Sequence, residues 1–221
     1  MKLIKHFLYK LVKTLKRKVL SRPKYKSSGE FWTQKMKITT INKRLDLFNE
    51  VCSNQSVLHF GCTDWPIFRP DYNLHIKLAK ITKELHGFDI DFEGIEKLKT
   101  YVDQAYFSDF NNMPKHKYDV CLIPETIEHV DNVATFLNNI SDIDAKSFYI
   151  TAPNCFSKNR FKHNFHKKET DFIELVHQDH NCWYSPYTLK NVIEKYSSLV
   201  VTDIFLMEND SMICCKAIKK A

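Results

Sequence analysis

Three carboxylates follow three consecutive apolar runs of this sequence: Asp64, Asp89 and Asp109. If the runs are parallel strands, their carboxyl ends meet at one edge of a sheet, which is where such folds bind ligands. Asp89 is then placed to accept hydrogen bonds from both hydroxyls of a ribose. Asp109 could accept from an adenine amino group while Phe110 packs on a ring face. Three acidic strand ends favour a cationic ligand over a pyrophosphate.

A glycine-led turn follows the first of these runs. Gly61 begins the segment Gly-Cys-Thr-Asp-Trp-Pro, and because glycine has no β-carbon, the backbone and a ligand can approach each other closely there. A dinucleotide site needs the pattern G-x-G-x-x-G so that a pyrophosphate can lie on a helix N-terminus. Thr63 and Pro66 occupy the places of the two later glycines. Hydride transfer with a dinucleotide is therefore not expected.

Candidate proton-transfer groups follow the fourth apolar run, in the stretch Pro-Glu-Thr-Ile-Glu-His-Val at 124–130. Glu125, Glu128 and His129 are the candidates in this stretch. An imidazole has a reference pKa of about 6.5, so His129 is suited to act as a general base near neutral pH. The alternative is that Glu128 and His129 cap the next helix and pair with each other.

The segment 154–187 has the weakest periodicity and is rich in basic and aromatic residues, as loops that carry function often are. Its stretch His-Gln-Asp-His could hold a metal, since imidazole and carboxylate are suitable ligands. Without a strong ligand spacing, no metal is expected. A surface loop with satisfied histidines remains the alternative. The candidates are His177 and His180 as bases, and Asn154, Trp183 and Tyr184 as contacts to a substrate such as a sugar.

Alternating strands and helices position these residues. Apolar runs of strand length alternate with helical patterns, which predicts a doubly wound α/β fold with a mostly parallel sheet. Only Glu208-Asn209-Asp210 separates the last two runs, so those strands must form an antiparallel hairpin. Strands are expected near 56–60, 85–90, 104–107, 118–124, 147–152, 199–206 and 211–218, and helices near 73–83, 92–102, 131–140 and 186–196.

The positive charge is concentrated at the N-terminus. Ten of the 33 basic residues precede Glu30, which leaves 23 bases against 26 acids in the rest of the chain, although the whole carries +7. Residues 1–20 have apolar residues at three- and four-residue steps and lysines on the other face, which predicts a basic amphipathic helix. Lysines interrupt every apolar stretch before the roughly 20 residues of a membrane span. A second helix is predicted over 30–52.

That arm suits an anionic inner-leaflet surface, where each basic residue adds about 1 kcal/mol of attraction. A protein partner, nucleic acid or packing on the domain itself are the alternatives.

The seven cysteines include no C-x-x-C pair that would indicate zinc or redox work. We expect a cytoplasmic protein, or one peripheral at the inner membrane surface. Its expected organisation is a basic arm at 1–26, a helical segment at 27–55 and one ligand-binding domain at 56–221.

Four motifs in order resemble those of class I S-adenosylmethionine-dependent methyltransferases, especially small relatives in bacterial polysaccharide and small-molecule pathways. The motifs are V-L-H-F-G-C-T-D-W-P, G-F-D-I-D, Y-D-V-C-L-I-P-E-T-I-E-H-V and F-Y-I-T-A-P-N, and the resemblance covers about residues 50–218. It implies a Rossmann-like seven-stranded sheet with an antiparallel last strand. Thr63 departs from the second glycine of the first motif. The resemblance places S-adenosyl-L-methionine against Gly61, Cys62, Asp64, Asp89, Ile90, Asp109, Phe110, Pro124 and Glu125.

The expected activity is O-methylation of a sugar or related hydroxyl compound, such as a lipid-linked or surface glycan. Alignment of nucleophile, methyl group and sulfur supplies most of the rate of such a transfer, so a single base is enough for an alcohol. One alternative is a non-catalytic module that binds a membrane or a partner. Another is an amine, carboxyl or nucleic-acid acceptor. The net negative body argues against nucleic acid.

Overall fold

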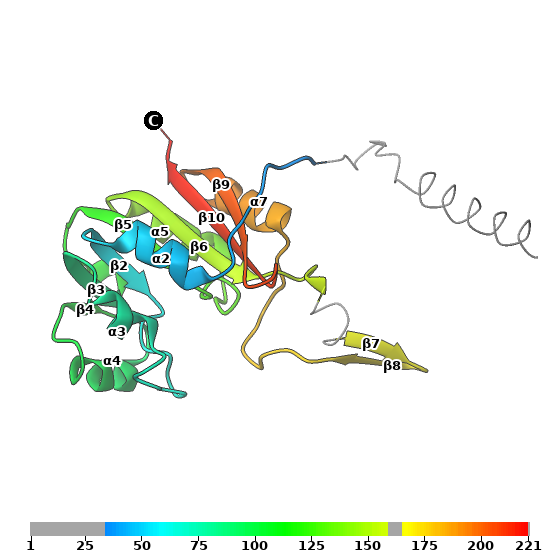
Figure 1. The fold of residues 1–221 in the computed structure, drawn as a ribbon, viewed down its shortest axis with the longest axis horizontal. Coiled ribbons are helices and arrows are strands. Elements are labelled where there is room, and N and C mark those ends of the chain that lie inside the picture. The colour runs from blue at the N-terminus through cyan, green and yellow to red at the C-terminus, as the bar shows by residue number, and fades with distance from the viewer. Residues whose placement is uncertain (1–33, 159–164, 221) are drawn as a thin grey trace, which may run out of the picture. The chain divides into compact units, whose positions relative to one another are not determined.

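The structure is a computed structural model and describes residues 34–158 and 165–220 (Figure 1). The chain divides into two units, 1–36 and 37–221, and almost all of the described residues belong to the second. The arm predicted at 1–26 and its amphipathic helix lie outside the described residues. Within the described part, none of the helices combines the length and apolar character that a membrane crossing requires.

A single large sheet organises the second unit (Figure 1). All of its neighbouring strands pair in parallel except at β10, which is antiparallel to both of its neighbours. The predicted doubly wound sheet with a reversed last strand is therefore confirmed. The strand order is β1 (Thr39–Thr40), β9 (Leu199–Met207), β10 (Met212–Lys219), β6 (Ala145–Pro153), β5 (Tyr118–Ile123), β2 (Ser56–Phe60), β3 (Glu84–Phe88) and β4 (Tyr106–Phe107).

Seven of these strands match the predicted runs, and β1 is an addition at the edge. The hairpin turn between β9 and β10 contains Glu208, Asn209 and Asp210, all three with positive φ. Left-handed backbone at consecutive residues suits the twist of a tight antiparallel connection. Parallel pairing also explains why the central strands are continuously apolar, since helices cover both faces of such a sheet.

Four α-helices of the described residues begin at polar caps, whereas α2 (Arg44–Cys52) has no side-chain cap. Side chains of Asn73, Asp91, Asn132 and Ser185 each accept a hydrogen bond from a backbone N–H in the first turn of the helix that follows. These bonds satisfy donors that helix geometry leaves unpaired. The helices are α2 (Arg44–Cys52), α3 (Leu74–Leu78), α4 (Phe92–Lys99), α5 (Val133–Asp142) and α7 (Pro186–Tyr196), with the 3₁₀ helix η1 (Phe110–Asn112) after β4.

The helix predicted over 30–52 is wrong for the described residues before Arg44. Residues 34–43 are not helical, and the short strand β1 pairs with β9. Ile41 continues this contact, because its N–H donates to the Leu206 carbonyl at 2.9 Å. The run Ile38-Thr39-Thr40-Ile41 consists of β-branched residues, which favour extended backbone. Within the described part of the predicted segment, 34–52, only α2 is a helix.

The core lies on both faces of the sheet. Leu47 and Phe48 of α2 and Leu78 of α3 pack with Val57 on one face. Phe60, three positions after Val57, points to the opposite face. There its ring meets Phe136 of α5 edge-on at 6.3 Å. The helices thus cover both sides and leave the carboxyl ends of the strands as the open edge.

A separate two-stranded sheet interrupts the weakly patterned segment 154–187. Strands β7 (Phe165–Lys168) and β8 (Asp171–Glu174) pair antiparallel (Figure 1). All four residues of β8 are exposed. The sequence pattern did not predict this hairpin, because neither strand alternates apolar and polar residues against a core.

Candidate functional site

The turn after β2 is built around Gly61. Its φ is +62°, a left-handed conformation that glycine adopts without steric cost. Its N–H donates to the Phe88 carbonyl of β3 at 2.9 Å. A β-carbon at this position would lie 2.9 Å from Thr126 Oγ1, in the turn after β5. Both the backbone conformation and the neighbouring turn therefore require glycine here.

Asp89 holds this turn from the end of β3. Its Oδ2 accepts from the Thr63 N–H at 3.0 Å and from the Thr63 hydroxyl at 2.8 Å. Its Oδ1 accepts from the Asp91 N–H at 3.1 Å. An ionised carboxylate offers about four acceptor sites, so Asp89 retains capacity for a ligand hydroxyl. Thr63, in place of the second glycine, is turned toward this acid and is buried.

Gly94 makes room for the threonine. A β-carbon on Gly94, in the first turn of α4, would lie 2.7 Å from Thr63 Cβ and 2.9 Å from Trp65 Cβ. The turn and the helix are therefore in direct contact. Sequence reasoning missed this role. The available signal was a glycine placed inside a helical pattern, which usually has a packing or functional reason.

Asn73 fastens the same turn from the other side. Its side-chain amide donates to the Cys62 carbonyl at 3.0 Å, the Thr63 carbonyl at 3.3 Å and Asp64 Oδ2 at 3.1 Å. The Cys62 thiol points inward, since a β-carbon on Gly87 would lie 2.8 Å from its sulfur. Burial raises the pKa of that thiol well above its usual range. Cys62 can therefore meet a ligand only through its backbone.

Charged residues gather where the turns after β2 and β5 face each other. Asp64 and Glu125 are both in left-handed conformations, with φ of 55° and 44°. Such strained residues cluster at functional sites. The Arg44 guanidinium from α2 pairs with Glu125. Partial burial raises the pKa of Asp64, and Arg44 opposes this shift. Pro124 is buried, and its carbonyl accepts from the Thr126 hydroxyl at 2.9 Å.

Apolar rings line the next part of the edge. Phe88 stacks on Phe60 with centroids 4.6 Å apart and lies against Phe110 at 4.7 Å. Asp109 is exposed, and its carboxylate caps η1 by accepting from the Asn111 N–H at 2.9 Å. Ile90 is 85% exposed. Exposed Ile90 and the partly buried Phe110 give this edge an apolar surface.

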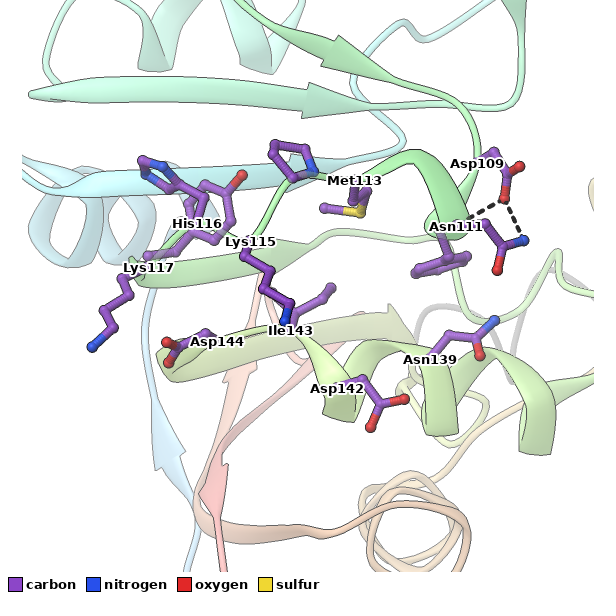
Figure 2. Close-up of a pocket in the computed structure, with 13 residues that line it drawn as sticks. Asp109, Asn111, Met113, Lys115, His116, Lys117, Asn139, Asp142, Ile143 and Asp144 are labelled. Carbon is purple, nitrogen blue, oxygen red and sulfur yellow. Dashed lines mark hydrogen bonds between the residues drawn. The ribbon is translucent and has the colours of Figure 1, made fainter.

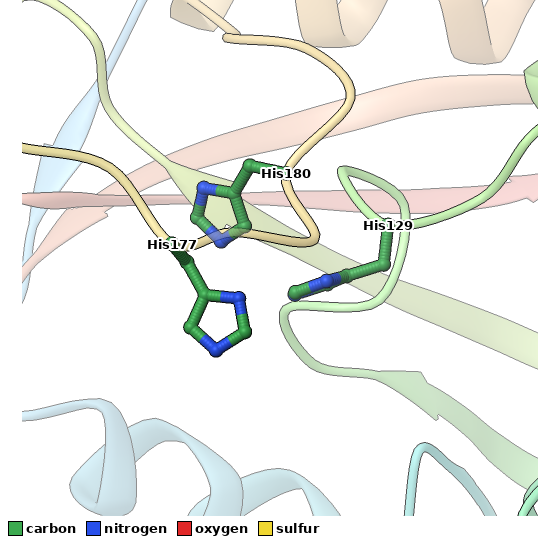
Figure 3. Close-up of side chains that lie close together, drawn as sticks. All are labelled: His129, His177 and His180. Carbon is green, nitrogen blue, oxygen red and sulfur yellow. The ribbon is translucent and has the colours of Figure 1, made fainter.

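Three predicted bases come together beyond Glu125. The ring of His129 lies 4.7 Å from that of His180 and 5.4 Å from that of His177, between centroids, and the last two are 5.3 Å apart (Figure 3). Asn181 explains the meeting, because its N–H donates to the Glu128 carbonyl at 2.8 Å and its side chain to the His129 carbonyl at 2.9 Å. Burial, and then His177, lowers the pKa of His129.

The predicted substrate contacts differ in their surroundings. The Trp183 ring lies 5.7 Å from that of His180, and its indole N–H donates to Glu174 at 2.9 Å. Asn154 and Tyr184 are both buried. The Asn154 amide donates to the Asp210 carbonyl at 2.8 Å. Asn154 and Tyr184 therefore hold the segment in place, whereas Trp183 lies beside the histidines.

Two buried histidines lie beneath the site. His59 Nδ1 and His75 Nδ1 are 3.1 Å apart. Both Nε2 atoms are buried without a hydrogen-bond partner among the described residues. Burial lowers the pKa of His75 to about 3 and that of His59 well below its usual range. The pair is therefore neutral at physiological pH and forms part of the core.

A surface cavity of about 640 Å³ lies to one side of this edge (Figure 2). It shares Asp109 and Phe110 with the predicted cofactor residues, but it continues to Tyr118 and Asp144, next to the amino ends of β5 and β6. The glycine turn and Asp89 do not line it. The carboxyl edge, with its strained turns and converging polar groups, is the better candidate for the functional site.

No protein-family model matches the sequence, and no curated protein matches it. Solved structures do share its fold. An S-adenosylmethionine-dependent methyltransferase from Aquifex aeolicus matches at TM-score 0.55 and 12% identity, over 80% of this chain and 88% of that one. Another from Mesorhizobium loti matches at TM-score 0.51 and 8% identity, over 76% and 93%.

A third similar structure is a chain of the Haloferax volcanii complex between the Trm112 methyltransferase activator and a methyltransferase. It matches at TM-score 0.52 and 13% identity, over 77% of this chain and 84% of that one. At these identities the likeness defines the fold alone. The described domain has the Rossmann-like fold of class I methyltransferases.

Proposed function

We propose that the protein is an S-adenosylmethionine-dependent methyltransferase that methylates a hydroxyl group of a sugar or a related small molecule. One observation carries the proposal: on a methyltransferase fold, the Gly61 turn is tied to the Asp89 carboxylate at the ligand-binding edge. The cofactor would supply a methyl group already activated by its positive sulfur.

The residues of the edge fit such a cofactor. The Gly61 turn lets its backbone approach the methionine part, and the remaining acceptor capacity of Asp89 suits a ribose hydroxyl. Exposed Ile90 and the Phe110 ring offer apolar surface to an adenine. Asp64 adds negative charge for a sulfonium, while the charge of Glu125 is offset by Arg44. Because these groups are fixed by the fold, they would orient the methyl group for an in-line transfer.

The histidine cluster and Trp183 form the acceptor side in this proposal. A hydroxyl placed among His129, His177 and His180 would pass its proton to an imidazole as the oxygen attacks the methyl carbon. The carbon–sulfur bond then breaks, and its electron pair stays on sulfur. The products are a methyl ether and the uncharged thioether. Trp183 offers a ring face of the kind that stacks on sugars.

Calorimetric titration with S-adenosylmethionine and its demethylated product tests the cofactor assignment. We expect micromolar binding by the intact chain and a weakening of about 10- to 100-fold in Asp89→Asn, which is the loss of one hydrogen bond to a charged group. Asp142→Asn, on the exposed end of α5, is the matched control and should bind as the parent does. Failure of the folded parent chain to bind either compound would refute the proposal.

The acceptor class needs a separate measurement. Methyl transfer from labelled cofactor to panels of sugars, other alcohols and amines should label hydroxyl compounds, and His180→Ala should reduce turnover while the affinity for the cofactor stays unchanged. Labelling of amines alone would contradict the hydroxyl assignment and leave the cofactor assignment standing.

We further propose that the enzyme acts in the cytoplasm and that the basic arm 1–26 holds it at an anionic membrane surface. The ten basic residues ahead of Glu30 support this, since each adds about 1 kcal/mol of attraction near such a surface. Co-sedimentation with vesicles of neutral and anionic lipid tests it. Replacing Lys16, Arg17 and Lys18 by glutamine should weaken binding to anionic vesicles. Equal binding to both vesicle types would contradict the assignment.

A further inference from the structure

Three imidazoles of the candidate site have the arrangement of an incomplete metal shell. One ring nitrogen from each of His129, His177 and His180 can be chosen so that all three lie within 4.8 Å of one another. Among the described residues, this is the one group of three or more histidine, cysteine, aspartate or glutamate side chains that meets this condition. Figure 3 shows the rings directed toward a shared space.

The spacing is close to what a metal requires. Zinc–imidazole bonds of 2.0–2.1 Å in tetrahedral geometry place the nitrogens about 3.4 Å apart. In the structure these nitrogens lie within 4.8 Å of one another, so any two of them would have to approach by roughly 1.4 Å at most to share one ion. The His177 side chain is 50% exposed and lies on a loop, so its ring can move by this amount without disturbing the core. His129 and His180 are both partly buried.

The backbone fixes where the rings originate. His177 and His180 belong to one turn, in which the His180 N–H donates to the His177 carbonyl at 3.1 Å. Asn181, the next residue, holds the His129 carbonyl at 2.9 Å. The three ligands therefore come from two segments that a hydrogen bond locks together. Hydrogen bonds that hold the ligand-bearing segments together distinguish a built site from a chance gathering of side chains.

Asp179 lies against two of the rings. Its N–H donates to His177 Nδ1 at 3.3 Å, and a hydrogen bond joins His129 to its backbone. Histidine ligands usually donate their second ring N–H to a carboxylate or a backbone carbonyl, which directs the other nitrogen to the metal. The Asp179 backbone can serve His129 in this way, whereas the exposed His177 ring must turn to offer a nitrogen to the metal.

We propose that His129, His177 and His180 bind a divalent transition metal of the Zn²⁺ type and leave a coordination position open for the acceptor. Three neutral imidazoles with an open position are a recognised catalytic zinc arrangement, and imidazole also suits Co²⁺ and Ni²⁺. The role of the ion rests on the proposed function: it would bind the acceptor hydroxyl and lower its pKa, and the hydroxyl proton would leave to solvent, because all three imidazoles would then be ligands.

The test uses the full chain, freed of metal by a chelator and titrated with Co²⁺, whose visible absorption reports bound ion and its geometry. We expect one ion per chain, displaced by Zn²⁺. His180→Ala should weaken Co²⁺ binding by more than about 100-fold, because even loss of an outer-shell partner costs about 10- to 100-fold. His116→Gln removes an imidazole that pairs with Glu84 elsewhere, and should leave Co²⁺ binding unchanged.

A second variant gives a positive signal. His177→Cys exchanges an imidazole for a thiolate on an exposed loop, so the fold should persist and a sulfur-to-cobalt charge-transfer band should appear. The metal proposal is overturned if the parent chain binds Co²⁺ no more tightly than His180→Ala, or if the cysteine variant gives no such band. Cofactor binding is measured on the same samples. Because the proposed cofactor contacts are Asp89 and the Gly61 turn rather than the histidines, a chain that binds cofactor but no Co²⁺ would refute the metal site alone.

Discussion

Replacing Gly94 by alanine adds a methyl group where the structure has no space for it. The new β-carbon would lie 2.7 Å from Thr63 Cβ and 2.9 Å from Trp65 Cβ, about 0.5–0.7 Å short of the 3.4 Å at which ordinary contact begins. Both neighbours are β-carbons attached directly to the backbone, so they cannot rotate away. The glycine turn itself must therefore shift, and the Thr63 hydroxyl, 2.8 Å from Asp89, moves with it.

The magnitude follows from two opposing effects. Overpacking of a close contact costs about 1–3 kcal/mol, and rigid neighbours place this site in the upper half of that range. The higher helix propensity of alanine offsets at most about 1 kcal/mol of this cost. We therefore expect Gly94→Ala to lower the free energy of unfolding by about 1–2 kcal/mol and Tm by about 2–8 °C. The affinity for the cofactor should fall about tenfold, since the turn is displaced.

Thermal melts and calorimetric titration with the demethylated cofactor measure both effects. Glu96→Ala on the exposed face of α4 is the control and should change stability by less than about 0.5 kcal/mol. Thr63→Gly removes the nearest clashing atoms, so the two substitutions together should be less harmful than the sum of their separate effects, with a coupling of about 0.5–3 kcal/mol. Additive effects, or unchanged cofactor binding in Gly94→Ala, would refute the reasoning.

Three further outcomes are expected. Gly61→Ala forces a side chain into a left-handed residue at a cost of about 1–2 kcal/mol, so urea denaturation should show that loss, and an unchanged midpoint would contradict the assigned strain. Asn181→Ala releases the loop that carries two of the histidines from His129, so methyl transfer should drop at least tenfold with cofactor affinity intact; a parallel fall in both would point to a general structural role. Burial lowers the pKa of His75 from 6.5 to about 3, so the unfolded chain binds a proton between these values that the folded chain does not. Stability is therefore complete above about pH 6.5 and falls by up to about 1.4 kcal/mol per pH unit below it, and equal urea midpoints at pH 7 and pH 5 would exclude this.

Local patterns were sufficient to predict the architecture. Strand-length apolar runs alternate with helical patterns, and the short Glu208-Asn209-Asp210 connection demands a reversed last strand. The helix predicted over 30–52 was wrong at residues 34–43, whose apolar residues do not keep helical spacing. There the β-branched run 38–41 and the free edge of β9 favour an extended backbone.

The site could be predicted only in part. Gly61 and Asp89 were found because strand ends in a parallel sheet meet at a known edge. Their direct connection through Thr63 was not visible, because it depends on a hydrogen bond across 26 residues of sequence. Asn73, Gly94 and the ion pair between Arg44 and Glu125 were missed for the same reason.

The sequence by itself determined the order and type of the elements, since periodicity and turn chemistry are local properties. It also determined which edge of the sheet carries polar groups. Only the tertiary structure decided that His129 meets His177 and His180. Asn181 joins their loops through its bond to the His129 carbonyl, and these two residues are 52 positions apart in the chain. Contacts of this kind arise when packing brings distant loops together, and no local pattern encodes them.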